Sequence, residues 1–247
     1  MIRLAATILL FEIKSLLRDA SQFWVVPISY IFFWFYLNYI YGVFHRDFVV
    51  LNECFEPLPW ILGFGIPILL ARSWRHDVGR QQILYSLSKP LPVFSSLLAR
   101  FVVHWAYWSL WNALCVSTIL SLEYYGASDR GSLVSAFIGL CLFSGLYIAL
   151  VQSLIISIRE PWLGCFLAIL LFSLTQYFSS FGVGFDSSSS TLFGGIYSLS
   201  PLRNLLPFLM GVVGLHEIIF FVFYTIFFLV MGWFALTAMK RGWITLR

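Results

Sequence analysis

Long apolar stretches separated by short polar segments dominate the chain. Six of these stretches approach the roughly 20 residues that a helix needs to cross a bilayer. They lie at about residues 22–44, 57–73, 93–121, 132–157, 161–181 and 216–239. Tryptophans lie near the ends of several stretches, as in the aromatic belts of membrane proteins. The pattern therefore predicts an all-α membrane protein with six transmembrane helices.

The first 20 residues follow a different pattern. Between residues 2 and 19, apolar positions recur at near-helical spacing beside a stripe that carries Arg3, Glu12, Lys14 and Arg18. This pattern predicts an amphipathic helix lying in the membrane interface, with its basic side toward the lipid headgroups. The alternative is a cytoplasmic extension of the first span.

Composition excludes several classes of protein. Of the 247 residues, 60% are hydrophobic and only 11% are charged, and the mean hydropathy is +0.89. A typical soluble domain has about 25% charged residues. A soluble enzyme, a disordered tail and a nucleic-acid-binding module are therefore excluded. The four cysteines show no C-x-x-C or Cys/His spacing, so neither a disulfide framework nor a zinc site is predicted.

The distribution of basic residues predicts the orientation. With the N-terminus in the cytoplasm and six crossings, twelve of the 15 Lys and Arg residues fall on the inner side. The other three, Arg46, Arg130 and Arg203, fall outside. Cytoplasmic loops are enriched in Lys and Arg. We therefore expect a multi-pass protein with both termini cytoplasmic, and attribute the net charge of +4 to topology.

Two connections are longer than the others, and function is often carried on such loops. One is the cytoplasmic segment 72–92, which is basic at first, then briefly amphipathic, and ends at Lys89-Pro90. It fits either a short helix that docks onto a partner or a solvated basic loop. The other is the outer segment 182–215, which we expect to be largely non-helical, with a possible return into the membrane.

The cytoplasmic segment resembles the signature region of type-2 ABC transporter permeases. In that family, a charged stretch leads into a short helix that ends at a proline, and a basic residue ten positions later begins the third span. Pro90 and Arg100 have this spacing. The charged stretch corresponds to Arg75, His76, Asp77 and Arg80. The chain departs from the family at Gln81-Gln82, where Gly-Thr is usual, and at Leu84, where an acid is usual.

A second segment narrows the resemblance. Leu199-Ser200-Pro201, followed by Phe208, Gly211 and Glu217, is similar to the segment before the last span of GldF-like permeases, the gliding-motility group. Pro90-Leu91-Pro92 and His104-Trp105 also resemble CcmB, the membrane subunit of the cytochrome c maturation transporter. A CcmB-like subunit for haem or cytochrome maturation is therefore the second choice.

The resemblance implies a single permease domain of type-2 ABC architecture in the bacterial inner membrane. Such a subunit is non-catalytic and pairs with a second permease, identical or homologous, and with two copies of a separate ATPase. The chain contains no G-x-x-x-x-G-K-[ST] phosphate loop, so ATP and Mg would be bound by that partner, and no cofactor is expected here. The expected cargo is an amphiphilic or envelope substrate that is moved or extracted.

The same resemblance assigns two sets of site residues. Contacts with the ATPase are expected from the coupling loop, residues 72–92, at Arg72, Arg75, His76, Asp77, Arg80, Gln81 and Gln82. The candidates for an outer gate are Ser200, Pro201, Phe208, Gly211 and Glu217.

An intramembrane enzyme is the alternative from another class. Ser144-Gly145 resembles the G-x-S-G motif of rhomboid proteases, but Leu142 replaces the first glycine. A serine nucleophile needs a nearby base, and His104 and His216 are candidates by residue type only. A helix-packing role for Ser144 is favoured. A metal site formed by His45 and His216 with Glu53 or Glu217 is supported equally weakly.

Overall fold

The computed structural model describes Leu10, residues 13–14, 20–40, 54–78, 93–121, 130–158, 160–182 and 200–245. Over these residues it is helical and contains no strand, which confirms the all-α prediction for this part of the chain. The elements are α2 (Ala20–Phe35), the π-helix η1 (Tyr36–Ile40), α4 (Pro57–Val78), α6 (Val93–Ser121), α7 (Arg130–Ile158), α8 (Pro161–Gly182), α10 (Pro201–Leu209) and α11 (Leu215–Thr245).

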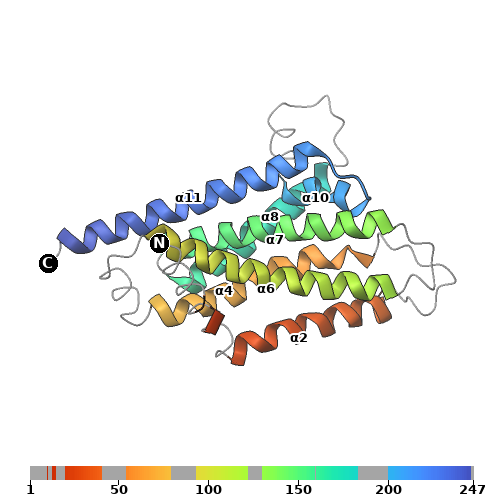
Figure 1. Ribbon diagram of the computed structural model, residues 1–247, viewed down its shortest axis with the longest axis horizontal. Coiled ribbons are helices and arrows are strands. Elements are labelled where there is room, and N and C mark those ends of the chain that lie inside the picture. The colour runs from red at the N-terminus through yellow and green to blue at the C-terminus, as the bar shows by residue number, and fades with distance from the viewer. Residues whose placement is uncertain are drawn as a thin grey trace.

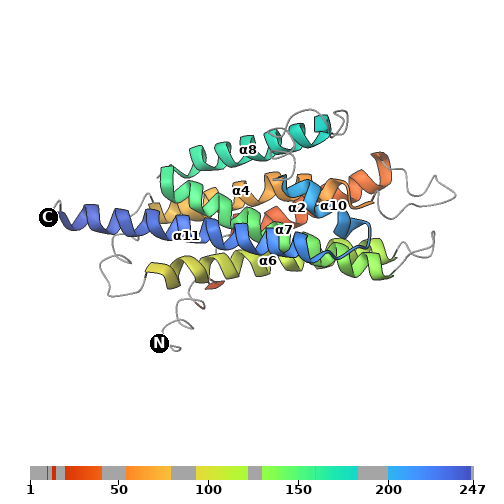
Figure 2. The ribbon, with the colours of Figure 1, turned by 90° about the horizontal axis from the view of Figure 1, so that it is seen from above.

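The long helices lie side by side along the longest dimension of the molecule, and successive helices run in opposite directions (Figure 1). One end of the bundle holds the end of α4, the start of α6 and the end of α11; we call it the basal end. The opposite end holds α10, and we call it the α10 end. Viewed from above, α6 and α8 lie on opposite sides of α7 (Figure 2). The chain therefore passes repeatedly between two ends.

Helix α7 is the centre of the bundle. It packs against α4, α6, α8, α10 and α11, and 67% of the residues in its most apolar stretch are buried. It is apolar around its whole circumference, as expected for a helix with neighbours on every side. Gly139 and Gly145 lie where Phe208 and Trp105 approach the helix closely. Small residues on α7 therefore allow its neighbours to pack against it.

Two of the described helices are long and apolar enough to cross a membrane. They are Arg130–Ile158 and Leu215–Met239. The second contrasts with the first, because only 17% of its most apolar stretch is buried. Of the six spans that the sequence predicts, these two are long and apolar enough by length and hydropathy alone. Helix α6 is equally long, but it contains His104, Asn112 and several tryptophans, which lower its hydropathy.

Several boundaries differ from the sequence expectation. Helix α4 continues beyond residue 73 to Val78, so the first seven residues of the predicted coupling loop are helical. The outer segment contains the short helix α10, whereas non-helical backbone was expected. The interfacial helix expected at 2–19 lies outside the described residues, apart from Leu10, Ile13 and Lys14, which are helical and exposed.

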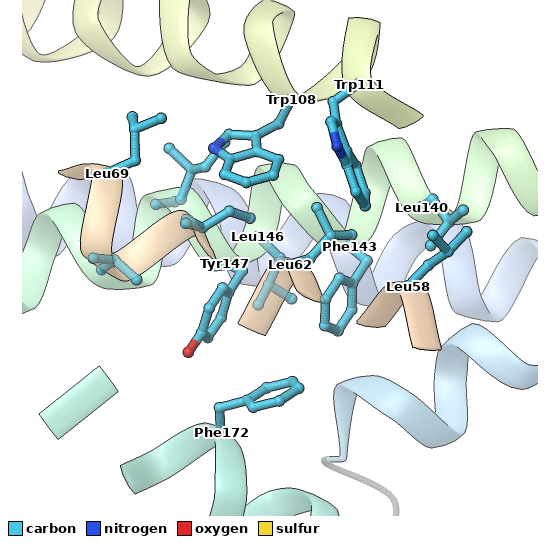
Figure 3. Close-up of a cluster of buried hydrophobic side chains, with 14 of the residues drawn as sticks. Leu58, Leu62, Leu69, Trp108, Trp111, Leu140, Phe143, Leu146, Tyr147 and Phe172 are labelled. Carbon is cyan, nitrogen blue, oxygen red and sulfur yellow. The ribbon is translucent and has the colours of Figure 1, made fainter. Parts of the chain in front are cut away.

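The buried core lies between α4, α6, α7 and α8 (Figure 3). Trp108 and Trp111 of α6 enter it from one side, and Phe172 of α8 enters it from the other. The Tyr147 hydroxyl of α7 lies within hydrogen-bonding distance of two carbonyl oxygens, at 3.1 Å from Gly63 of α4 and 3.0 Å from that of Ala168 of α8. One hydroxyl therefore joins three helices.

Candidate functional site

The basal end of α4 is the first candidate site, because it carries the residues expected to contact an ATPase. Arg72 is exposed on this helix, and Arg75, His76 and Asp77 lie on its last turns. Arg80, Gln81 and Gln82 lie outside the described residues. The structure therefore places the first four of these seven residues on a continuous helix and leaves the other three untested.

A cation–π contact joins this end of α4 to the start of α6. The guanidinium carbon of Arg100 lies 4.3 Å from the centre of the Trp74 ring, which is 5% exposed. Such contacts contribute about 0.5–2 kcal/mol, and more when they are shielded from water. The helices that precede and follow residues 79–92 are therefore held together at their basal ends.

The second candidate site is α10, which contains most of the proposed gate residues. Ser200 precedes it as a buried N-cap residue, and Pro201 occupies the first turn, where a missing N–H costs nothing. The Asn204 side chain donates a 3.0 Å hydrogen bond to the Ser200 carbonyl. This hydrogen bond stabilises the first turn of α10.

A Schellman motif ends α10. The Gly211 N–H donates to Phe208 O at 3.2 Å, and the Val212 N–H donates to Pro207 O at 2.9 Å. This motif requires a left-handed residue, and Gly211 has a φ of +88°. A proline near the start and a glycine just past the end are sequence signals that could have indicated this helix, which was not expected.

Phe208 fixes α10 against the α10 end of α7. The Ser135 hydroxyl donates a 2.6 Å hydrogen bond to the Phe208 carbonyl, and the Phe208 side chain lies directly over Gly139. The Phe208 ring centre is 6.2 Å from that of Phe221 on α11. Phe208 is fully buried, so α10 is packed into the bundle in this structure.

The other gate candidates lie around this contact without forming one cluster. Gly211 faces Ser132 at the start of α7. Glu217 belongs to the first turn of α11, and its carboxylate lies against Gly214. A carboxylate at this position interacts favourably with the positive end of the helix dipole. Phe208 and Gly211 thus both pack against α7, whereas Glu217 lies at the N-terminus of α11.

The residues considered for catalysis have local hydrogen bonds. Ser144 is buried, and its hydroxyl donates to Cys141 O at 2.9 Å. The His104 ring nitrogen Nδ1 lies 2.8 Å from Arg100 O. Among the described residues, Ser144 and His104 share no hydrogen bond, and no group of three or more His, Cys, Asp or Glu side chains could hold a metal. His45 and Glu53 lie outside those residues.

Two other features of the bundle could not be predicted from the sequence. Trp105 of α6 donates its indole N–H to Cys141 O of α7 at 2.8 Å. Beside this bond, a shallow apolar groove of about 200 Å³ runs between α6, α7 and α11. It is lined by Phe101, Trp105, Cys141, Leu142, Gly145, Val222, Thr225 and Ile226. Only the placement of the helices shows which polar atom meets which carbonyl.

Comparisons with protein-family models and with curated protein sequences found no match for this chain.

Proposed function

We propose that this chain is the membrane permease subunit of an ATP-driven, exporter-type ABC transporter. The subunit spans the bacterial inner membrane with six helices and keeps both termini in the cytoplasm. A separate ATPase, present in two copies, binds ATP and Mg, and a second permease completes the membrane part. The cargo is an amphiphilic or envelope substrate.

The exposed surface supports placement in a bilayer. Helix α11 presents large apolar side chains outward along most of its length, including Leu215, Phe223 and Phe234, which are 60–74% exposed. Large contiguous apolar surfaces are rare on soluble monomers. Lipid covers such a surface without the cost of contact with water. The repeated passage of the chain between two ends supports more than the two spans that hydropathy alone identifies.

The positions of basic residues support the orientation. Arg72 and Arg100 lie near the basal end, and the last turns of α11 there contain Lys240 and Arg241. The α10 end has Arg130 and Arg203. Under the positive-inside rule, this distribution supports the basal end as the cytoplasmic side.

The observation that carries the proposal is the continuation of α4 through its basic stretch, together with its contact with α6. Trp74 and Arg100 join the helices that precede and follow residues 79–92, the rest of the proposed coupling loop. A partner that moves this segment acts on both helices at once, and both pack against α7. Movement of an ATPase would reach the centre of the bundle by this route.

Helix α10 is the extracytoplasmic gate in this proposal. Its packing on Ser135 and Gly139 represents the closed position, because Phe208 fills the space between α7 and α11. Opening would withdraw Phe208 from this space.

Charge reversal tests the docking assignment. The double variant Arg75→Glu/Arg80→Glu should lose at least about tenfold in the amount of ABC ATPase that co-purifies in mild detergent, because basic contacts become repulsive to an acidic partner surface. The ATPase is identified by its phosphate-binding-loop peptides and by its copy ratio to the permease.

Arg130→Glu/Arg203→Glu is the matched control, since it also reverses two arginines, here at the α10 end. It should leave ATPase recovery unchanged. Equal recovery from the double variant and the wild type, with both chains monodisperse, would contradict the docking assignment.

A further inference from the structure

The core contains a set of buried polar groups that lack hydrogen-bond partners. Among the described residues, no partner exists for His104 Nε2 or for either amide atom of Asn112 and Gln152. His104 is 2% exposed, and Asn112 and Gln152 are completely buried. The indole N–H groups of three buried tryptophans, Trp74, Trp108 and Trp111, also lack a hydrogen-bond acceptor.

On α6, these groups follow one another at helical spacing. His104, Trp108 and Trp111 recur every three or four residues and therefore share one side of the helix. This side faces α4, because the Trp108 ring lies against Gly65 and Trp74 lies against Arg100. Figure 3 shows Trp108 and Trp111 pointing from α6 toward α4 and α7.

Gln152 lies on the side of α7 that faces α6. It lies seven residues after Gly145 and eleven after Cys141, spacings that place Gln152 within about 20° of each of them on a helix of 3.6 residues per turn. Gly145 and Cys141 both contact Trp105 of α6. The Cys141 thiol also lies beside Asn112, although a thiol is only a weak hydrogen-bonding group.

The polar groups extend along much of the bundle. Leu97 of α6 and Ser153 of α7 both lie against Gly232, so Gln152 is level with Leu97. Asn112 is fifteen residues further along α6, which corresponds to about 22 Å at 1.5 Å per residue. The hydrocarbon core of a bilayer is about 30 Å thick. The series therefore covers most of the membrane depth inside one subunit.

Leaving these groups without partners would be costly. A buried donor or acceptor that makes no hydrogen bond keeps the full penalty of its removal from water. Six residues of this kind would together cost an amount comparable to the whole stability of a typical domain. Lipid tails offer no partners, and the facing groups are mostly donors. A small molecule that both donates and accepts hydrogen bonds satisfies them all.

We infer that the junction of α4, α6 and α7 binds a chain of internal water molecules, which connects Gln152 near the basal end with Asn112 in the second half of α6 through His104 and the tryptophan N–H groups. Buried waters typically make about three hydrogen bonds to polar groups that would otherwise be unsatisfied. The inference goes beyond the proposed function, since it depends on membrane placement and not on any partner. A hydrated junction also lets α6 shift against α4, because bonds to water exchange readily.

Radiolytic footprinting of the full chain in lipid nanodiscs tests this inference. Hydroxyl radicals generated by X-rays from bound water oxidise the adjacent side chains, which mass spectrometry locates. Corrected for intrinsic reactivity, Trp108 and Trp111 should be oxidised at least about fivefold faster than the buried rings Phe143 and Phe172, because bound water would lie against their N–H groups. Oxidation of the two tryptophans as slow as that of the two phenylalanines would overturn the inference.

A double variant, Asn112→Leu/Gln152→Leu, provides the second measurement. Removing both amides should bring the oxidation rate of Trp108 down to that of Phe143. Thr237→Val, which removes a hydroxyl from α11 away from the junction, should leave the rate unchanged. Fast oxidation that persists in the double variant would overturn the assignment of water to these residues. Neither measurement uses an ATPase, so failure here is separate from failure of the docking experiment.

Discussion

At the scale of single residues, polar side chains fix how the apolar helices meet. Tyr147, Ser135 and Trp105 each donate a hydrogen bond to a carbonyl group of a different element. Apolar packing alone tolerates sliding of one helix along another, whereas a side chain bonded to one carbonyl sets a single position. In a bilayer no bulk water competes for these bonds.

Tyr147 makes the most connected of these contacts, and its loss should be measurable. Tyr147→Phe removes the hydroxyl shared by Gly63 O and Ala168 O and leaves both carbonyls without this donor. We expect a loss of about 1–2 kcal/mol in stability. Thermal unfolding of the purified protein should show a decrease in Tm of about 2–8 °C.

Tyr39→Phe is the control for this variant. Tyr39 is 77% exposed and stacks on Phe35, so loss of its hydroxyl should leave Tm unchanged. Equal Tm values for Tyr147→Phe and the wild type would show that the hydroxyl does not join the three helices.

At the scale of elements, close approach between α10 and α7 depends on one glycine. A Cβ atom at Gly139 would collide with the Cβ of Phe208 and would touch Leu205. Both atoms belong to α10, and a Cβ cannot move without its backbone. An alanine at this position can be accommodated only if the whole short helix shifts.

Gly139→Ala should therefore destabilise the protein by about 1–3 kcal/mol, the usual cost of overpacking a core. Gly232→Ala on α11 is the matched control, because a Cβ there would make ordinary contacts of 3.5–3.6 Å. Thermal unfolding of both variants gives the comparison. A Gly139→Ala protein as stable as Gly232→Ala would mean that α10 is not packed on α7 as described.

Sequence patterns predict these elements unevenly. The long apolar stretch 93–121 has the same bounds as α6, because tryptophans and aliphatic residues continue through it without a break. Helix α10 is missed because nine residues are too few for a span, although Leu205, Phe208 and Leu209 have helical spacing. The end of α4 is misplaced because its charged residues indicate a loop on a membrane scale and are equally compatible with a helix.

The sites are harder to predict than the helices. The sequence shows that Asn112 and Gln152 are polar residues in apolar stretches, but it cannot show that both face one junction. Which carbonyl group accepts the hydrogen bond from Tyr147 or Ser135 depends on how two helices are rotated about their axes and how far one is shifted along the other. These quantities follow from packing over the whole bundle, and no local spacing encodes them.

At the scale of the whole molecule, burial is distributed very unevenly. Helix α7 is enclosed by its neighbours, whereas α11 is mostly uncovered. The two ends of the bundle also differ, since one carries the basic end of α4 and the other carries α10. Such an arrangement fits a protein whose two ends face different aqueous compartments.

Cysteine labelling tests this arrangement. In a background with the four native cysteines replaced, Met210→Cys beside α10 should react with a membrane-impermeant maleimide added to spheroplasts, because Met210 is 66% exposed at the α10 end. Ser157→Cys at the basal end of α7 is likewise exposed, but it should react only after the membrane is permeabilised.

Labelling of both positions in intact spheroplasts would contradict the proposed topology. Labelling of Ser157→Cys alone would show that the orientation is the reverse of the proposed one.

The enclosure of α7 has a consequence for how this sequence can evolve. A residue with packed neighbours on every side is constrained in size and shape, so drift along α7 must be compensated by paired changes in α4, α6, α8 or α11. The outer face of α11 needs only to remain apolar, and leucine, isoleucine, valine and phenylalanine can replace one another there freely. Among homologues, sequence similarity should therefore persist longest in α7 and be lost first along the outer face of α11.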